Sequence, residues 1–416
     1  MKKSIKSTDN LNNLEFRCDF IAMAIVCVLS VHFFYIFGTH FHIPSSGSIG
    51  SFLALIFFGM GLLQGQRISF ANYPHLLLAN ILILIVTTHA YVKYSEMTAM
   101  KFFAFSFMPM LLVFCKYDYK KVIRYTCYMT PLLFVVHNDL FVLHGSFDQM
   151  EMGYSYAIIH ILVSNMIQFI YFKKESNFYM KLCNFASVYL LLRVFMTATR
   201  GSMLSLLVAV FLLWIIKFDD NGKYIKLTQK KKIKIFVVFV VLVIVYINLA
   251  PVLDFIETVF NKLFGATPAA IKKTLDAINS NDLSHGRDEI AIFAENAIKN
   301  KPFFGHGVLT FHYFNHYSYP HNWVLQILFE GGIVGALYQI ICIVYGAFNL
   351  VFRAEKSGKE KTYCNLLICL TAFPMLFFSN EMWTTPAFWI FMVIGGRELK
   401  TSFVKNIVMK KNGGNE

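Results

Sequence analysis

Long apolar stretches, repeated along almost the whole chain, constrain its fold more than any other feature. They are interrupted by one extended polar segment, at 251–320. A helix needs roughly 20 apolar residues to cross the hydrocarbon core of a bilayer, and it satisfies its own backbone hydrogen bonds there. The pattern therefore predicts an all-α integral membrane protein with one large loop outside the membrane.

Twelve stretches fit this rule, and two of them are short. Together they define three regions: nine spans in 1–250, the large loop at 251–320, and three spans with a tail in 321–416. The first stretch begins near Cys18, too far along the chain for a cleaved signal, and is interpreted as a retained span. The predicted spans are 18–37, 48–64, 74–92, 100–115, 122–143, 155–172, 178–197, 201–216, 233–250, 322–350, 362–379 and 384–397.

Charge patterning predicts the orientation and argues against a nucleic-acid partner. Only 15% of residues are charged, and the net charge of +14 comes from short basic clusters between apolar stretches. The N-terminus and alternate loops hold 27 of the 38 Lys and Arg residues, whereas 251–320 has six basic and seven acidic residues. By the positive-inside rule both termini are cytoplasmic and 251–320 lies outside, in the periplasm.

Two arginines mark the outer ends of the seventh and eighth predicted spans. Arg200 stands in Thr199-Arg200-Gly201 between them, and Arg193 lies inside the seventh. Arg200 can simply extend to the interface, as arginines at helix ends do. Arg193 needs a partner or a hydrated cavity, so it is either structural or part of a substrate path.

A short helix is predicted inside the polar segment. Apolar residues recur at helical spacing from Ile290 to Ile298, Gly286-Arg287 precedes them, and Pro302 follows the expected end near Asn300. Arg287 can pair with a nearby carboxylate. An arginine beside a helix N-terminus can also bind a diphosphate.

Another group of polar residues stands where the polar segment meets the tenth span. Pro320-His321-Asn322 opens this span, and Glu330 follows nine residues after His321 in Glu330-Gly331-Gly332. A lone His here can be structural, but an imidazole is also a natural general base for a sugar hydroxyl. Glu330 can be structural, shape a cavity or pair with Arg193, and the glycines can serve tight helix packing.

No metal or cofactor is predicted. The eight cysteines lie in or beside apolar stretches, no Cys/His spacing resembles a zinc site, and neither a phosphate-binding glycine loop nor an outer Asp-x-Asp pair is present.

Taken in order, the motifs at Arg200, Arg287, Pro302–Gly307, His321-Asn322 and Glu330-Gly331-Gly332 resemble the O-antigen ligase and polymerase family of bacterial envelope glycosyltransferases. The resemblance covers about 185–350 and implies a GT-C-like helical membrane fold. It also implies an inner-membrane enzyme that works without a metal on a glycan linked to undecaprenyl diphosphate. A chain-length regulator and membrane lipid are the partners that this would involve.

The resemblance assigns roles to individual residues. Arg200 and Arg287 match essential arginines that bind the diphosphate, and His321 matches the essential histidine that acts as base or orients the acceptor. Arg193, Asn322 and Glu330 are then candidates for substrate binding. The His-Asn and Glu-Gly-Gly elements favour a polymerase, which transfers the chain to a lipid-linked repeat unit.

Two alternatives to the polymerase stay open. A ligase, which transfers the glycan to lipid A core, shares the His-Asn element. A flippase or other transporter would suit the number of spans, although a carrier typically shows two related halves.

Overall fold

The structure is a computed structural model that describes residues 19–43, 48–68, 103–135, 149–197, 200–219, 221–225, 228–265, 267–280, 287–315, 317, 319–376 and 381–395. Within these ranges the regular structure is helical, and the β-type pairing consists of an isolated bridge between Phe218 and Tyr224. The predicted all-α class is confirmed. The predicted span 74–92 and the C-terminal tail lie outside the described residues.

The described part of the chain is made almost entirely of helices. In chain order they are α2 (Phe20–Leu29), α3 (Val31–His40), α4 (Ile49–Leu63), the π-helix η4 (Phe103–Phe107), α7 (Met108–Val113), α8 (Tyr119–Tyr128), α9 (Thr130–Val135), α10 (Gln149–Tyr171), the 3-10 helix η5 (Lys173–Glu175), α11 (Phe178–Thr197), α12 (Arg200–Ile215), α13 (Gln229–Ile247), α14 (Leu249–Phe264), α15 (Ala269–Asn279), α16 (Arg287–Asn300), α17 (Phe311–Phe314), α18 (Trp323–Phe352), α19 (Ala354–Ser357), α20 (Lys359–Leu376), the 3-10 helix η6 (Met382–Thr384) and a last helix, Pro386–Gly395.

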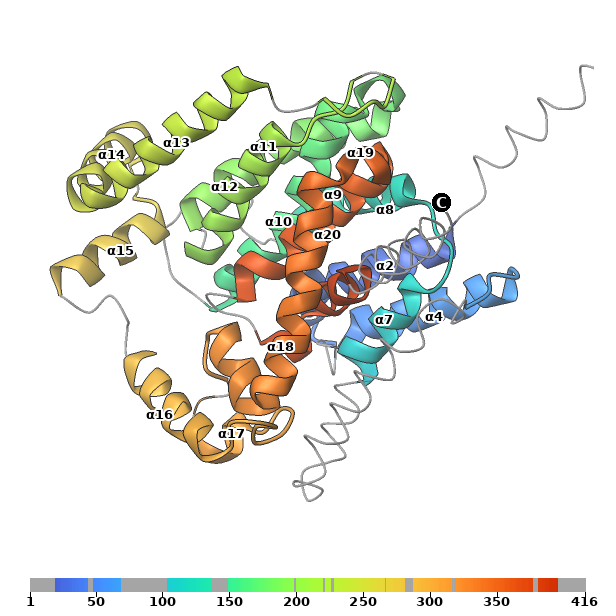
Figure 1. The fold of residues 1–416 in the computed structure, drawn as a ribbon. Coiled ribbons are helices and arrows are strands. Elements are labelled where there is room, and N and C mark those ends of the chain that lie inside the picture. The colour runs from blue at the N-terminus through green and yellow to red at the C-terminus, as the bar shows by residue number, and fades with distance from the viewer. Residues whose placement is uncertain are drawn as a thin grey trace, which may run out of the picture.

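The bundle is organised around α10, which contacts α3, α8, α11, α12 and α20 (Figure 1). Its apolar residues from Ala157 to Val163 are almost completely buried. Near its end, the ring of Tyr171 stacks on Tyr363 of α20, with 4.1 Å between ring centroids. This packing joins the first half of the chain to its C-terminal helices.

The predicted spans differ in how the helices realise them. Span 18–37 is not one straight helix, because α2 and α3 meet at a 72° bend. Ser30, at the bend, lies 2.9 Å from His160 through its hydroxyl, which gives this buried group a hydrogen-bond partner. Among the described helices, α18 is long and apolar enough to cross a membrane, and two bent pairs, α2–α3 and α13–α14, also qualify when each is taken as one span. The all-helical, largely apolar chain is consistent with an integral membrane protein, and twelve spans stay a prediction.

The segment 251–320 contains most of α14 together with α15, α16 and α17. The helix expected near Ile290–Ile298 is α16, which ends at Asn300 as the sequence pattern predicts. Ile290 and Ala294 face inward and form a small apolar cluster with Phe311 and with Phe329 of α18. Figure 1 shows α16 and α17 beside the first part of α18, and this packing positions the candidate site.

Candidate functional site

A break in α18 organises the candidate site. Gly332 has φ 61° and ψ −166°, which no helix contains, and it divides the 30-residue helix. The backbone amides of Ile333 and Val334 donate to the carbonyls of Pro302 and Phe303, at 2.8 and 3.1 Å. The Pro302–Gly307 turn therefore supplies hydrogen bonds that the helix loses at its break.

Amides of the turn also donate hydrogen bonds to carbonyls of α18. The amide of His306 donates to the carbonyl of Phe329 at 2.7 Å, and that of Gly307 donates to the carbonyl of Glu330 at 3.1 Å. Two of the motifs identified in the sequence are thus one structural unit, held together by four backbone hydrogen bonds.

Close backbone approach explains two of its glycines. A Cβ on Gly332 would lie 2.3 Å from the carbonyl oxygen of Phe303, and one on Gly305 would lie 2.5 Å from the carbonyl carbon of Glu330. Both residues also have positive φ angles. The alternative explanation of the glycines, tight helix packing, finds no support at Gly331 or Gly335 among the described residues, because the nearest atom to a Cβ at either position belongs to Ile327 of the same helix.

His306 anchors this unit to α16. Its Nε2 lies 2.8 Å from the carbonyl oxygen of Ala297, and its ring stacks on Phe329 at 4.6 Å. The residue is only 7% exposed, and burial lowers the pKa of the ring. His306 therefore ties the turn to the C-terminal half of α16, the helix that begins at Arg287.

Arg287, in the middle of the predicted outer region, acts electrostatically on His321, which directly follows that region. Burial, and after it the positive charge of Arg287, lowers the pKa of His321 from its usual 6.5 to about 4. The His321 ring is half-buried against Tyr319, with 4.3 Å between ring centroids, and its backbone has φ 52°. Nδ1 is buried and makes no hydrogen bond within the described structure. Burial and the charge of Arg287 thus both favour the neutral form of this imidazole.

Asn322 has a clear local task. It is the N-cap of α18, and its Oδ1 accepts hydrogen bonds from the amides of Val324 at 2.9 Å and Leu325 at 3.3 Å. These bonds satisfy amides that the first turn of a helix leaves unpaired. The side-chain oxygen of Asn322 is therefore occupied in capping α18. Substrate binding by Asn322 stays a prediction.

Glu330 is 1% exposed and is surrounded by hydrogen-bond donors. The indole of Trp383 donates to Oε2, the amide group of Gln326 donates to Oε1 at 3.4 Å, and the backbone of Leu309 also forms a hydrogen bond with the carboxyl group. The partner suggested by the sequence, Arg193, is a residue of α11 whose side chain lies outside the described atoms. Glu330 thus ties α18 to η6 and to the Pro302–Thr310 turn region.

The segment before the last helix adds residues that the motif search missed. The amide of Met382 donates to Oε1 of Gln326 at 3.1 Å, which places Glu381 beside the first turns of α18. The negative charge of Glu381 acts on both Tyr319 and Glu330. Glu381 and Trp383 are separated from His321 by about 60 residues, and only a Glu-Met-Trp sequence between two apolar helices hinted at them.

The charges of Glu381 and Arg287 also act on the hydroxyl of Tyr319, which packs against His321. Burial raises the pKa of its hydroxyl, and Tyr156 and Glu381 raise it further. The positive charge of Arg287 opposes this rise. Electrostatic interactions at the start of α18 therefore connect four side chains, those of Arg287, His321, Tyr319 and Glu381.

The remaining predicted residues are placed only by their backbone. Arg200 is the first residue of α12 and Arg193 lies within the last two turns of α11. Their side chains, like that of Thr199, lie outside the described atoms, so whether either arginine reaches His321 stays a prediction. The described residues contain no group of three or more His, Cys, Asp or Glu side chains that could hold a metal ion.

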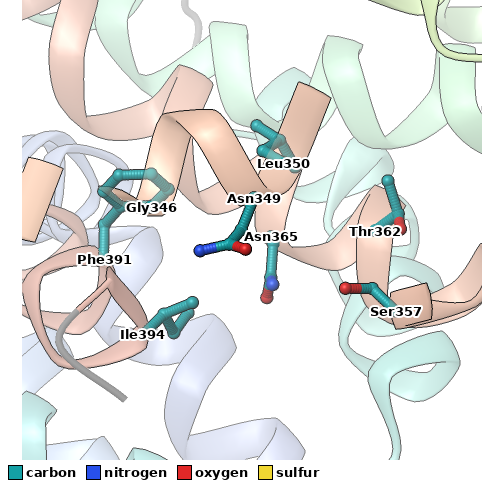
Figure 2. Close-up of a pocket in the computed structure, with 8 residues that line it drawn as sticks. All are labelled: Gly346, Asn349, Leu350, Ser357, Thr362, Asn365, Phe391 and Ile394. Carbon is teal, nitrogen blue, oxygen red and sulfur yellow. The ribbon is translucent and has the colours of Figure 1, made fainter. Parts of the chain in front are cut away.

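A small cavity lies at the opposite end of α18. Figure 2 shows Asn349 of α18 and Asn365 of α20 projecting into it, with Ser357 and Thr362 on one side and Phe391 on the other. Its volume of about 10 Å³ is close to the space for a single water molecule. It is too small for a sugar or a lipid and is distinct from the site around His321.

Comparison with known families supports the resemblance. Residues 185–340 match the Wzy_C family model, described as O-antigen ligase. The matched region starts in α11 and ends in α18. It includes Arg193, Arg200, all of α16 with Arg287, the Pro302–Gly307 turn and His321. No curated protein matches the chain.

Proposed function

We propose, because residues 185–340 match the O-antigen ligase family model, that the chain is an O-antigen polymerase, which transfers a glycan from undecaprenyl diphosphate to a lipid-linked repeat unit at the periplasmic face of the inner membrane. The observation that supports this proposal is the electrostatic influence of Arg287 on His321, which with burial favours the neutral imidazole just before α18. A cation for a leaving diphosphate and a base for an incoming hydroxyl are the two groups that such a transfer needs.

The proposed reaction is one displacement at the anomeric carbon of the donor sugar. The acceptor hydroxyl oxygen forms a bond to this carbon as the bond to the diphosphate oxygen breaks, with inversion of configuration. The bonding electron pair leaves with the diphosphate, whose charge Arg287 and Arg200 stabilise. The hydroxyl proton passes to the imidazole of His321.

Electrostatic coupling suits His321 to this role. Its pKa of about 4 keeps the imidazole neutral near pH 7, so it can accept a proton. When a diphosphate binds, its negative charge offsets the positive charge of Arg287 and raises the proton affinity of the imidazole. Donor binding therefore prepares the base.

The environment of Glu330 supports the geometry of the same site. Its buried carboxyl group connects α18 to Trp383 and Leu309, and thereby holds the Pro302–Thr310 region against the helix that begins two residues after His321. We propose that Glu330 maintains the site and that Glu381, closer to Tyr319, contributes to acceptor binding. Arg193 and Asn322 are proposed to line the path of the donor.

A ligase is the second candidate, because the matching family model bears the description O-antigen ligase. Both reactions use the same donor and the same displacement, and they differ in the acceptor. Deletion of the gene in its own host separates them when lipopolysaccharide is examined on a gel. Core with a single repeat indicates a polymerase, whereas bare core with polymer retained on undecaprenyl diphosphate indicates a ligase.

The same experiment tests whether the chain is a transferase at all. Bare core with unpolymerised lipid-linked units retained on the cytoplasmic side would favour a flippase and refute the proposal. Complementation with His321→Ala or Arg287→Ala should restore no polymer at normal protein level. Arg287→Lys should restore little, because an ammonium group cannot form the paired hydrogen bonds of a guanidinium.

Matched controls lie on the same elements. His312 in α17 and Lys299 in the last turn of α16 are both exposed, and alanine at either position should leave polymer unchanged. Normal polymer with both His321→Ala and Arg287→Ala would contradict the assignment of the site.

A further inference from the structure

An apolar groove lies along α11, between α10 and α12, away from the site around His321. Its volume is about 630 Å³, and its walls include Phe169, Phe185, Val188, Leu207 and Val210. The side chain of Phe185 is 78% exposed and that of Val188 is 65% exposed. So much exposed apolar surface along a concave wall fits a hydrocarbon ligand better than water.

One end of the groove is basic. Lys173 and Lys181 both line it, and their side chains are exposed. Glu175, the nearby carboxylate, forms ion pairs with Lys120 and Arg124, and no ion pair in the described part of the chain involves Lys173 or Lys181. The Lys173 ammonium lies 5.5 Å from the centre of the Phe169 ring, where the apolar wall begins. The groove thus combines an apolar wall with two cations at one end.

The length of the groove matches one leaflet. Lys181 and Leu191, which both line it, are ten residues apart on α11. At about 1.5 Å per residue this separation is roughly 15 Å, half of the ~30 Å hydrocarbon core. The lysines lie in loops or helix ends that the charge pattern assigns to the cytoplasmic face, so the groove would occupy the inner leaflet.

The basic end is also distant from the arginines proposed to bind the donor. Lys181 precedes Arg193 by twelve residues on the same helix, roughly 18 Å along its axis. A diphosphate held at the outer ends of α11 and α12 could not reach Lys181. The anion that fits the lysines therefore belongs to a different molecule.

We propose that this groove binds one anionic phospholipid of the inner leaflet. Its phosphate lies between Lys173 and Lys181, and one acyl chain extends along Phe185 and Val188. This binding site is independent of the proposed transfer reaction.

Native mass spectrometry of the full chain in detergent tests the proposal, with phosphatidylglycerol and phosphatidylcholine added separately. Lys173→Ala with Lys181→Ala should weaken binding of one phosphatidylglycerol about 25-fold, since the attraction usual for one lysine near an anionic headgroup corresponds to roughly fivefold in affinity. The matched control is Lys230→Ala with Lys232→Ala, because these lysines are exposed at the start of α13 and do not line the groove.

A second variant tests whether binding requires the apolar groove and not the lysine charges alone. It also gives an independent result if the double-alanine variant fails to fold. Val188→Trp keeps both lysines and fills the apolar wall at an exposed position, and it should also displace the phosphatidylglycerol. Equal retention of phosphatidylcholine, unchanged binding by the double-alanine variant, or unchanged binding by Val188→Trp would each overturn the proposal. Copurification of a polyprenyl phosphate instead of a phospholipid, lost on Val188→Trp, would also overturn it.

Discussion

Replacing Gly332 by alanine should destabilise the protein strongly for its small change in volume. The backbone at φ 61° and ψ −166° is accessible almost only to glycine and costs a side-chain-bearing residue about 1–3 kcal/mol. The new Cβ would lie 2.3 Å from the carbonyl oxygen of Phe303, so the turn must move away. That movement breaks the bonds from Ile333 and Val334, each worth about 1 kcal/mol. The free energy of unfolding should therefore fall by about 3–5 kcal/mol.

Gly335→Ala is the matched control on the same helix. A Cβ there would meet its nearest neighbour, Ile327, at an ordinary 3.6 Å, and alanine in a helix interior is favoured over glycine by about 1 kcal/mol. Unfolding in mixed detergent micelles measures both variants, and hydrogen exchange at Ile333 and Val334 reports the two amides directly. If Gly332→Ala and Gly335→Ala unfold with free energies within about 0.5 kcal/mol of each other, the interlocked turn does not exist as described.

Three further outcomes are expected. Arg287→Ala removes the smaller of the two causes that lower the pKa of His321, so this pKa should rise above about 4 while burial keeps it below 6.5. The pH at which diethyl pyrocarbonate modifies half of His321 should rise with it, and an unchanged midpoint would show that Arg287 does not act on His321. Trp383→Phe removes a hydrogen-bond donor from the buried carboxyl group of Glu330 and should lower the free energy of unfolding by about 1–3 kcal/mol. Trp389→Phe should lower it less, because the Trp389 indole donates to the backbone carbonyl of Met382. A larger loss for Trp389→Phe would contradict this account of Glu330. Asn322→Ala removes the N-cap of α18 and should lower the free energy of unfolding by about 1 kcal/mol. Asn322→Asp should keep most of the capping stabilisation, so equal decreases in the thermal unfolding temperature of the two variants would argue against capping.

Local patterns predicted the parts of the fold that depend on local forces. The apolar repeat from Ile290 to Ile298 and the proline at 302 are sufficient to define α16, because helix periodicity and helix termination act within a few residues. The same holds for the apolar stretches that became α11, α12 and α18. Their lengths and hydropathy are visible in the sequence.

The break at Gly332 had no comparable local signal. Its positive φ depends on a turn that lies about 30 residues earlier, and a Gly-Gly pair inside an apolar stretch is equally compatible with close helix packing. Close packing does occur on α18, but at Gly346, where a Cβ would lie 3.0 Å from the Phe391 ring. At the bend between α2 and α3, Ser30 is likewise hydrogen-bonded to a residue distant in sequence, His160.

For the candidate site, the sequence suggested candidate residues but not most of the residues that contact them. His321 and Arg287 were predicted from their motifs, and the structure brings them into electrostatic contact. Glu381, Trp383 and Leu309 came from segments without a recognisable motif, since their association with Glu330 follows from the packing of the last helices against α18. Asn322 was assigned to substrate, whereas its oxygen is visibly used by the helix it begins.

For the proposed transfer reaction, the division of α18 at Gly332 would set the height of His321 above the membrane. The whole helix has 30 residues and would be about 45 Å long, more than the ~30 Å that lipid tails occupy. The portion from Ile333 to Phe352 alone is about 30 Å long and suffices to cross the bilayer. The portion from Trp323 to Gly331 would then project into the headgroup region, so that a hydrophilic sugar chain could reach His321 from the aqueous side while its polyprenyl anchor remained in the lipid.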